Sequence, residues 1–249
     1  MLKAVTFDLG DTLIDYGPMD YGLMMRYGLR SSYEYLETLP GIVAPPEALF
    51  AQRVGRAVRF TWYRSKLLVE DRNVETQMVA ALAGLGVRLA DQAAEREFVR
   101  QFFAALTRLT RPMIGAAETL QSLAERHLAL AVVSNTVIPP WLLDESLEAV
   151  DLLRFFPRRY YSCAMGVKKP ARRMFAPVLH DLGVAPDEVL HVGDRYLTDV
   201  WGAKRSGLKS CLFVGHRSLP IPPVRPDFRI RHMKDLLPII DQLAESGAP

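Results

Sequence analysis

The stretch LKAVTFDLGDTL, residues 2–13, decides how this chain is interpreted. Residues 2–7 form a short and largely apolar run that ends in an acid, Asp8. Such a run, without alternation of polar and apolar residues, is typical of a strand buried on both faces of a parallel sheet. Comparable runs follow at 128–133, 189–192 and 211–214, with a weaker one at 158–162.

Helical segments alternate with these strands in the C-terminal half. Residues 117–126 and 171–182 have the length and amphipathic pattern of helices, and Gly183 is a plausible C-cap of the second. This alternation predicts an α/β fold, a doubly wound parallel sheet. A proline-rich stretch, residues 220–226, is expected to be a loop.

The long segment after the first strand breaks this rhythm. It contains no convincing strand, and helical periodicity recurs at 47–63, 73–83 and 91–109. We therefore predict an α/β core of residues 1–15 and 112–249 with an inserted all-α cap domain, residues 16–111. Where the chain passes into the cap, residues 16–27 are expected to line the closed pocket or act as a hinge.

Composition excludes several classes of protein. With 249 residues, 49% hydrophobic and 24% charged, the chain is too apolar to be disordered. A net charge of +3 does not predict a nucleic-acid binder, and no apolar run approaches the ~20 residues that span a membrane. Asp8 stands where a secretion signal needs apolar residues, and two cysteines make no disulfide framework or metal cluster. We expect a soluble cytoplasmic protein that binds neither nucleic acid nor membranes; the oligomeric state stays open.

Polar residues gather after four of the predicted strands. They are Asp8, Gly10, Asp11 and Thr12, then Ser134 and Asn135, then Lys168 and Lys169, and finally Asp194, Arg195 and Asp199. In a doubly wound sheet, ligands bind beyond the carboxyl ends of the strands. A carboxylate there can act as a nucleophile, and a hydroxyl and a lysine can bind the oxygens of a transferring phosphoryl group. Acids that face one another repel unless a cation such as Mg²⁺ lies between them.

Four motifs carry a family resemblance. FDLGDTL (7–13), VVSNT (132–136), GVKKP (166–170) and HVGDRYLTDVWGAKRSG (191–207) occur in this order, each at a strand end. With them, the chain resembles the haloacid dehalogenase (HAD) superfamily, in the subclass with a helical C1-type cap, over residues 2–237. The resemblance implies a phosphatase-like, Mg²⁺-dependent hydrolase that acts on small phosphorylated molecules through an aspartyl-phosphate.

The resemblance also implies roles for individual residues. Asp8 is the nucleophile and a ligand of Mg²⁺, together with the backbone carbonyl of Gly10 and the carboxylate of Asp194. Asp199 supports the metal site, while Ser134 and Lys169 hold the phosphoryl oxygens.

Three further residues are substrate-binding candidates. Thr12 and Asn135 order the loops around the site, and Arg195, at its mouth, is a candidate contact for a substrate anion. Lys168 is expected to be a solvated neighbour and His191 a core histidine.

Gly10 departs from the family pattern. The family's phosphatases carry a second aspartate two residues after the nucleophile, as general acid and base, whereas the nearest aspartate here is Asp11. In an extended chain residues 8 and 10 share a side and residue 11 points elsewhere, so Asp11 is either a catalytic substitute or a turn residue. Loss of a positioned acid costs about 10²–10⁴ in rate. We therefore expect acyl or aryl phosphates to be favoured over alkyl phosphates.

Two other functions remain open. One is a catalytically weak or inactive relative that binds a phospho-ligand, and the other is a metal-independent dehalogenase. The pair Asp194 and Asp199 argues against the second, because a dehalogenase has no use for two metal-site acids.

Overall fold

A computed structural model describes residues 1–17, 20–67, 71–215 and 224–245. Its main sheet has six parallel strands in the order β5-β4-β1-β6-β7-β8. The strands are β1 (Ala4–Phe7), β4 (Ala129–Ser134), β5 (Arg158–Tyr161), β6 (Val189–Gly193), β7 (Lys209–Phe213) and β8 (Phe228–Ile230). The prediction of a doubly wound α/β sheet is confirmed.

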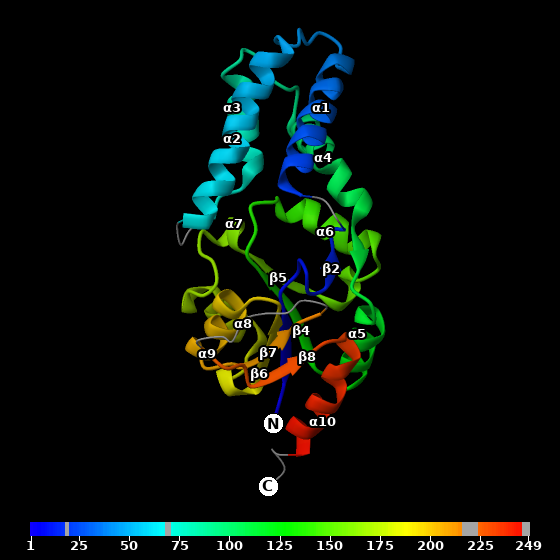
Figure 1. The fold of residues 1–249 in the computed structure, drawn as a ribbon, viewed down its shortest axis with the longest axis vertical. Helices are drawn as coiled ribbons and strands as arrows, with labels where there is room; N and C mark the ends of the chain where they lie inside the picture. The colour runs from blue at the N-terminus through cyan, green and yellow to red at the C-terminus, as the bar shows by residue number, and fades with distance from the viewer. Residues whose placement is uncertain (18–19, 68–70, 216–223, 246–249) are drawn as a thin grey trace.

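Helices cover both faces of this sheet (Figure 1). The helices of the sheet part of the chain are α5 (Ala116–Glu125), α6 (Pro140–Ala149), α7 (Ser162–Met165), α8 (Ala176–Leu182), α9 (Trp201–Arg205) and α10 (Leu236–Glu245). The helix expected over 171–182 is shorter than predicted, because residues 172–174 form a separate 3-10 turn. Gly183 ends α8 as expected, with a left-handed φ of 64°. Of the expected loop 220–226, residues 220–223 lie outside the described residues.

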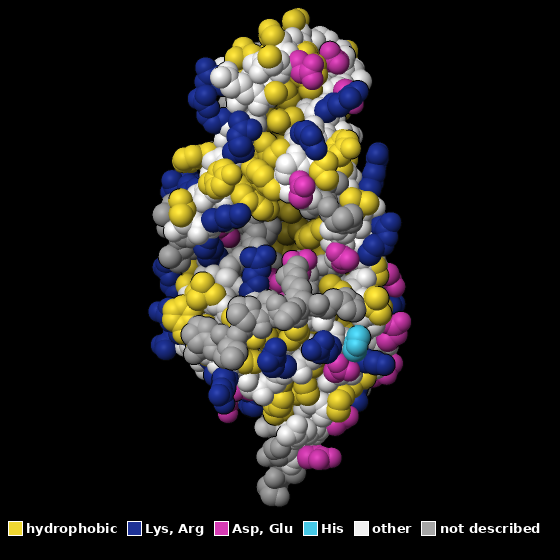
Figure 2. All heavy atoms as spheres, in the orientation of Figure 1, with side chains coloured by type: hydrophobic (Ala, Val, Ile, Leu, Met, Phe, Trp, Pro, Cys, Tyr) yellow, Lys and Arg dark blue, Asp and Glu magenta, His cyan; other side chains and the backbone are white. Residues whose placement is uncertain are grey.

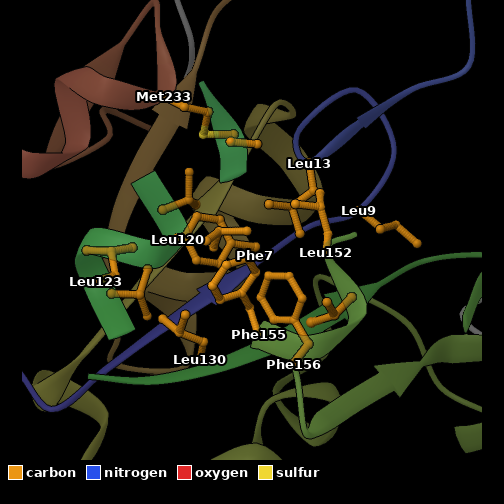
Figure 3. Packing of buried hydrophobic residues seen from close by; sticks show 14 of the residues in the cluster. Phe7, Leu9, Leu13, Leu120, Leu123, Leu130, Leu152, Phe155, Phe156 and Met233 are labelled. Atoms are coloured by element: carbon orange, nitrogen blue, oxygen red, sulfur yellow. The ribbon is translucent and has the colours of Figure 1, made fainter. Parts of the chain in front are cut away.

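Successive residues of β1 point into different apolar clusters. Val5 and Phe7 belong to the cluster under α5, and Ala4 belongs to the cluster under α8. Figure 3 shows Phe7 in the first cluster beside Phe156, with the two ring centroids 6.0 Å apart. Burial on both faces is the physical reason for the unbroken apolar pattern of this strand.

Four helices stand above the carboxyl ends of the strands (Figure 1). They are α1 (Tyr21–Thr38), α2 (Glu47–Leu67), α3 (Val74–Ala83) and α4 (Gln92–Leu109). Asn73 and Asp91 start α3 and α4, because each side chain accepts a hydrogen bond from a backbone N–H of the first turn. These helices bury an apolar cluster of their own, which includes Phe50, Phe98 and Phe102.

The chain passes between the sheet and these helices along one narrow ribbon. Strand β2 (Ile14–Asp15) pairs antiparallel with β3 (Arg111–Pro112), so Asp15 lies opposite Arg111. Figure 2 shows a hollow in the surface between the helical part and the sheet part, with hydrophobic side chains on its upper wall. Among the described helices, none combines the length and apolar character that crossing a membrane requires.

Candidate active site

The three central strands bring three of the predicted motifs to one edge of the sheet. Asp8 follows β1, Ser134 is the last residue of β4, and Asp194 follows β6. Because β4, β1 and β6 are parallel neighbours, their carboxyl ends meet at that edge. A cavity of about 510 Å³ lies there, and the predicted site residues that line it are Asp8, Gly10, Asp11, Ser134, Asn135, Lys169 and Arg195. The other three, Thr12, Asp194 and Asp199, are buried beside it.

Lys169 makes close contact with the expected nucleophile. Its ammonium Nζ lies 3.0 Å from Asp8 Oδ1 and 2.6 Å from Asp199 Oδ1, and it donates to the carbonyl oxygen of Val133 at 2.6 Å. These contacts use all three of its N–H donors. Burial lowers the pKa of Lys169, but the charges of Asp199 and Asp8 outweigh it and raise the pKa above its usual value. The buried lysine therefore stays positively charged.

Asn135 joins two of the loops around the site. Its Nδ2 donates to the carbonyl of Lys169 at 2.8 Å, and its Oδ1 accepts from the backbone N–H of Lys169 at the same distance. This paired contact ties the end of β4 to the loop after α7. The position of the Lys169 ammonium thus depends on the amide of Asn135.

Asp199 is held by a buried chain of hydrogen bonds that begins on β1 and passes through β6. The hydroxyl Oγ1 of Thr6 lies 2.9 Å from His191 Nδ1, and His191 Nε2 lies 3.3 Å from Asp199 Oδ1. Burial lowers the pKa of His191, so the imidazole is neutral and has one donor and one acceptor nitrogen. Since a carboxylate only accepts, Nε2 carries the proton and Nδ1 accepts from Thr6. His191 is buried, as expected of a core histidine.

Gly193 makes room for this carboxylate. A Cβ at Gly193 would lie 2.4 Å from Asp199 Cγ, so any other residue there would displace Asp199. The second oxygen of Asp199 accepts from the backbone N–H of Arg195 at 2.9 Å. Burial raises the pKa of Asp199, but the Lys169 charge and the His191 bond outweigh it and lower the pKa below its usual range.

The acids Asp8, Asp194 and Asp199 form a cluster that fits a hard cation. Each offers a carboxylate oxygen, and these oxygens all lie within 4.8 Å of one another. Burial, followed by the charges of Asp8 and Asp199, raises the pKa of Asp194 to about 7. Oxygen ligands of this kind suit Mg²⁺, and a divalent cation would relieve the mutual repulsion that the raised pKa reflects.

The loop after Asp8 turns at once. Asp11 adopts a left-handed φ of 59°, and its backbone N–H donates to the carbonyl of Ile14 at 2.8 Å. Asp11 therefore lies in a turn, and it also lines the cavity. Thr12 is the next residue of this turn and is fully buried, and its backbone N–H donates to the carbonyl of Leu9.

Arg195 stands at the mouth of the cavity. Its side chain is 66% exposed, and its Nε lies 3.8 Å from Asp194 Oδ2. It is therefore in reach of both the acid cluster and solvent.

Comparison with known proteins decides the family. A family model described as haloacid dehalogenase-like hydrolase matches residues 2–207. The chain belongs to this family. It is therefore a hydrolase, and three of its four motifs lie where β1, β4 and β6 end, while GVKKP (166–170) follows α7.

Similar proteins carry different names. Phosphoserine phosphatase of Thermus thermophilus is 29% identical to this HAD-like hydrolase over 94% of this chain and 98% of the relative. Phosphoglycolate phosphatase 1 of Pseudomonas aeruginosa is 28% identical over 99% and 83%. A solved 2-haloacid dehalogenase of Pseudomonas syringae pv. Tomato has a TM-score of 0.67 at 20% identity, covering 98% of this chain and 100% of that one. At that identity the likeness shows the fold alone.

The helical segment between β2 and β3 of this HAD-like hydrolase contributes contacts that sequence reasoning missed. Asp71, which precedes α3, is buried and lines the cavity, and its Oδ2 accepts from the hydroxyl of Ser162. The expectation that Lys168 is solvated is wrong: its side chain is 16% exposed, its Nζ lies 3.7 Å from Asp71 Oδ1, and it donates to the carbonyl of Ser65. Nothing local in the sequence indicates these contacts, because they join distant parts of the chain.

Proposed function

We propose that this hydrolase is a Mg²⁺-dependent phosphomonoesterase that acts through an aspartyl-phosphate on Asp8. The observation that carries the proposal is the buried ammonium of Lys169, 3.0 Å from the Asp8 carboxylate at the base of the cavity. A fixed positive charge beside a carboxylate suits a reaction in which negative charge develops on phosphoryl oxygens. The two relatives named as phosphatases, aligned over most of this chain, support it.

The chemistry proceeds in two displacements. In the first, an Asp8 oxygen attacks phosphorus, the bond from phosphorus to the ester oxygen breaks, and the leaving group departs with that electron pair. In the second, water attacks phosphorus, the bond to Asp8 breaks, and inorganic phosphate and the free carboxylate are formed. The Ser134 hydroxyl would hold phosphoryl oxygens in both steps, and Lys169 would do so with the N–H that now bonds to Asp8.

Mg²⁺ would be held by Asp8, the carbonyl of Gly10 and Asp194. When bound, it neutralises negative charge on the phosphoryl group and on the acids. Both oxygens of Asp199 accept hydrogen bonds, one from Lys169 and the other from the Arg195 backbone, so we assign Asp199 a positioning role beside the metal site. Gly10 offers no acid to the leaving group, so we propose that good leaving groups, such as acyl and aryl phosphates, are favoured.

Phosphate release tests the proposal. The substrates are p-nitrophenyl phosphate, acetyl phosphate and a panel of sugar and nucleotide monophosphates, each with Mg²⁺ or with a chelator. We expect turnover that disappears with the chelator and with Asp8→Asn. The matched control is Asp241→Asn, which changes an aspartate paired with Arg126 on the surface and should keep wild-type activity. Asp11→Asn reports whether the turn aspartate transfers protons.

Other outcomes identify the alternatives. Binding of phosphate and Mg²⁺ without turnover of any substrate would replace the proposal with a phospho-ligand binding protein. Release of halide from 2-haloacids in the presence of chelator would replace it with a dehalogenase.

A further inference from the structure

The ring of Tyr16 occupies the space that a side chain at position 10 would need. A Cβ built on Gly10 would lie 2.9 Å from Tyr16 Cε2 and 3.9 Å from Cζ, the carbon that carries the hydroxyl. Carbon atoms of folded proteins do not approach so closely without displacement. The present placement of Tyr16 therefore requires a glycine at position 10.

Tyr16 is fixed at the junction of the two parts of the molecule. It follows β2 directly, and its side chain packs against both the sheet cluster that contains Phe7 and the helical cluster that contains Phe102. Contacts with two apolar clusters leave the ring little rotational freedom. The same side chain lines the cavity with Asp8.

The phenol of Tyr16 is a neutral donor beside two acids. Burial, and then the charges of Asp8 and Asp11, raise the pKa of Tyr16 above its usual value. The hydroxyl therefore keeps its proton at physiological pH and can donate a hydrogen bond.

One part of the cavity lining is apolar or aromatic, and polar residues such as Lys66 line the rest. Trp62 of α2 contributes to the apolar part from the cap, while Val137, Ile138 and Leu143 contribute to it from the sheet part. Phosphoryl oxygens belong near Lys169, so the leaving group of a substrate faces the remaining lining. A flat, apolar leaving group can pack against the Tyr16 ring and this apolar part of the lining.

We propose that Tyr16 determines leaving-group specificity: its ring forms the wall against which an aryl leaving group packs, and its hydroxyl donates a hydrogen bond to the leaving oxygen. The inference rests on the proposed phosphatase function and refines its substrate class to aryl phosphates. Such a bond strengthens as negative charge develops on the oxygen, and it requires no proton transfer from the phenol. The aryloxide that departs takes its proton from water.

Leaving-group dependence tests the role of the hydroxyl. We would measure kcat/KM of the wild type and Tyr16→Phe on phenyl phosphates whose ring substituents grade the leaving group, with p-nitrophenyl phosphate as the best. Loss of the bond should lower kcat/KM about 10–100-fold for unsubstituted phenyl phosphate and less for p-nitrophenyl phosphate. The matched control is Tyr160→Phe, which removes a phenol that donates to Asp181 away from the cavity and should follow the wild type. Equal losses for all substrates with Tyr16→Phe would overturn the hydrogen-bond role.

Thermal unfolding tests the steric part without any substrate. Gly10→Ala should lower Tm because its methyl group collides with the Tyr16 ring, whereas Gly10→Ala combined with Tyr16→Ala should melt no lower than Tyr16→Ala alone. If the Tm losses of Gly10→Ala and Tyr16→Ala add up in the double variant, the ring does not occupy the space beside Gly10. If the wild type hydrolyses no phosphate ester, the proposed function and the leaving-group role fail together. If the wild type is active and Tyr16→Phe shows the same leaving-group dependence as the wild type, the role of Tyr16 is refuted while the proposed function stands.

Discussion

Replacement of Lys169 by methionine should destabilise the fold strongly, and more at neutral than at acidic pH. Lys169 is 1% exposed and lies within 3.0 Å of carboxylate oxygens of both Asp8 and Asp199, the latter also 1% exposed. Removal of one partner from a buried ion pair costs about 3–5 kcal/mol, because the remaining charge stays buried and unpaired. At a urea m-value of about 2 kcal/mol/M, the unfolding midpoint should fall by about 1.5–2.5 M.

The pH dependence follows from Asp199. In the wild type its pKa is lowered by Lys169, so its stabilising contribution is present above the unfolded pKa and is lost as pH falls through the folded pKa. Without Lys169, burial raises the pKa of Asp199 in the folded variant above its pKa in the unfolded chain. The variant therefore takes up protons on folding, and it loses stability as pH rises above the pKa of Asp199 in the unfolded chain. The difference in the free energy of unfolding between Lys169→Met and the wild type should therefore be larger at pH 7 than at pH 4.5.

Urea unfolding with a chelator present measures both effects. Lys3→Met is the matched control, because Lys3 is 56% exposed and pairs with Glu188 on the surface, where such a pair contributes about 0–1 kcal/mol. A Lys169→Met midpoint that falls no further than that of Lys3→Met, or a loss that does not depend on pH, would refute the argument from buried charge.

Three more predictions follow from the site. Mg²⁺ affinity measured by calorimetry should rise about tenfold from pH 6 to pH 8, because Asp194, with a pKa of about 7, must lose its proton to bind a cation. The Asp194→Asn variant should bind Mg²⁺ weakly at both pH values. His191→Leu should lower kcat more than it changes KM, because Asp199 loses the bond that orients it; equal kcat would contradict this positioning role. Asp71→Ala should raise KM for phosphate esters and leave kcat of the reaction on Asp8 in place, because Lys168 loses its acidic partner, which precedes α3. An unchanged KM would contradict this prediction.

Local patterns were enough to predict five of the six strands of the main sheet. Apolar runs placed β1, β4 and β6 within a few residues, and the rule that ligands bind at strand ends then grouped Asp8, Ser134 and Asp194. Strand β8 was missed because it is three residues long at the sheet edge, where little apolar pattern is needed.

The contacts within the site required the folded chain. Sequence order does not reveal that Lys169 reaches Asp199 as well as Asp8, or that Tyr16 fills the space beside Gly10. Each contact depends on which side chains the packing of distant segments brings together. A pattern over a few neighbouring residues carries no information on that.

The ribbon of β2 and β3 has a consequence for how such a molecule can diversify. Asp15 and Arg111 are paired across it, so the helical segment between them leaves the sheet and returns at a single point. The entropy of closing a loop grows only with the logarithm of its length, and doubling that length costs only about 0.6 kcal/mol. Helices can therefore be added, removed or exchanged above the ribbon while the strands that hold Asp8 keep their register.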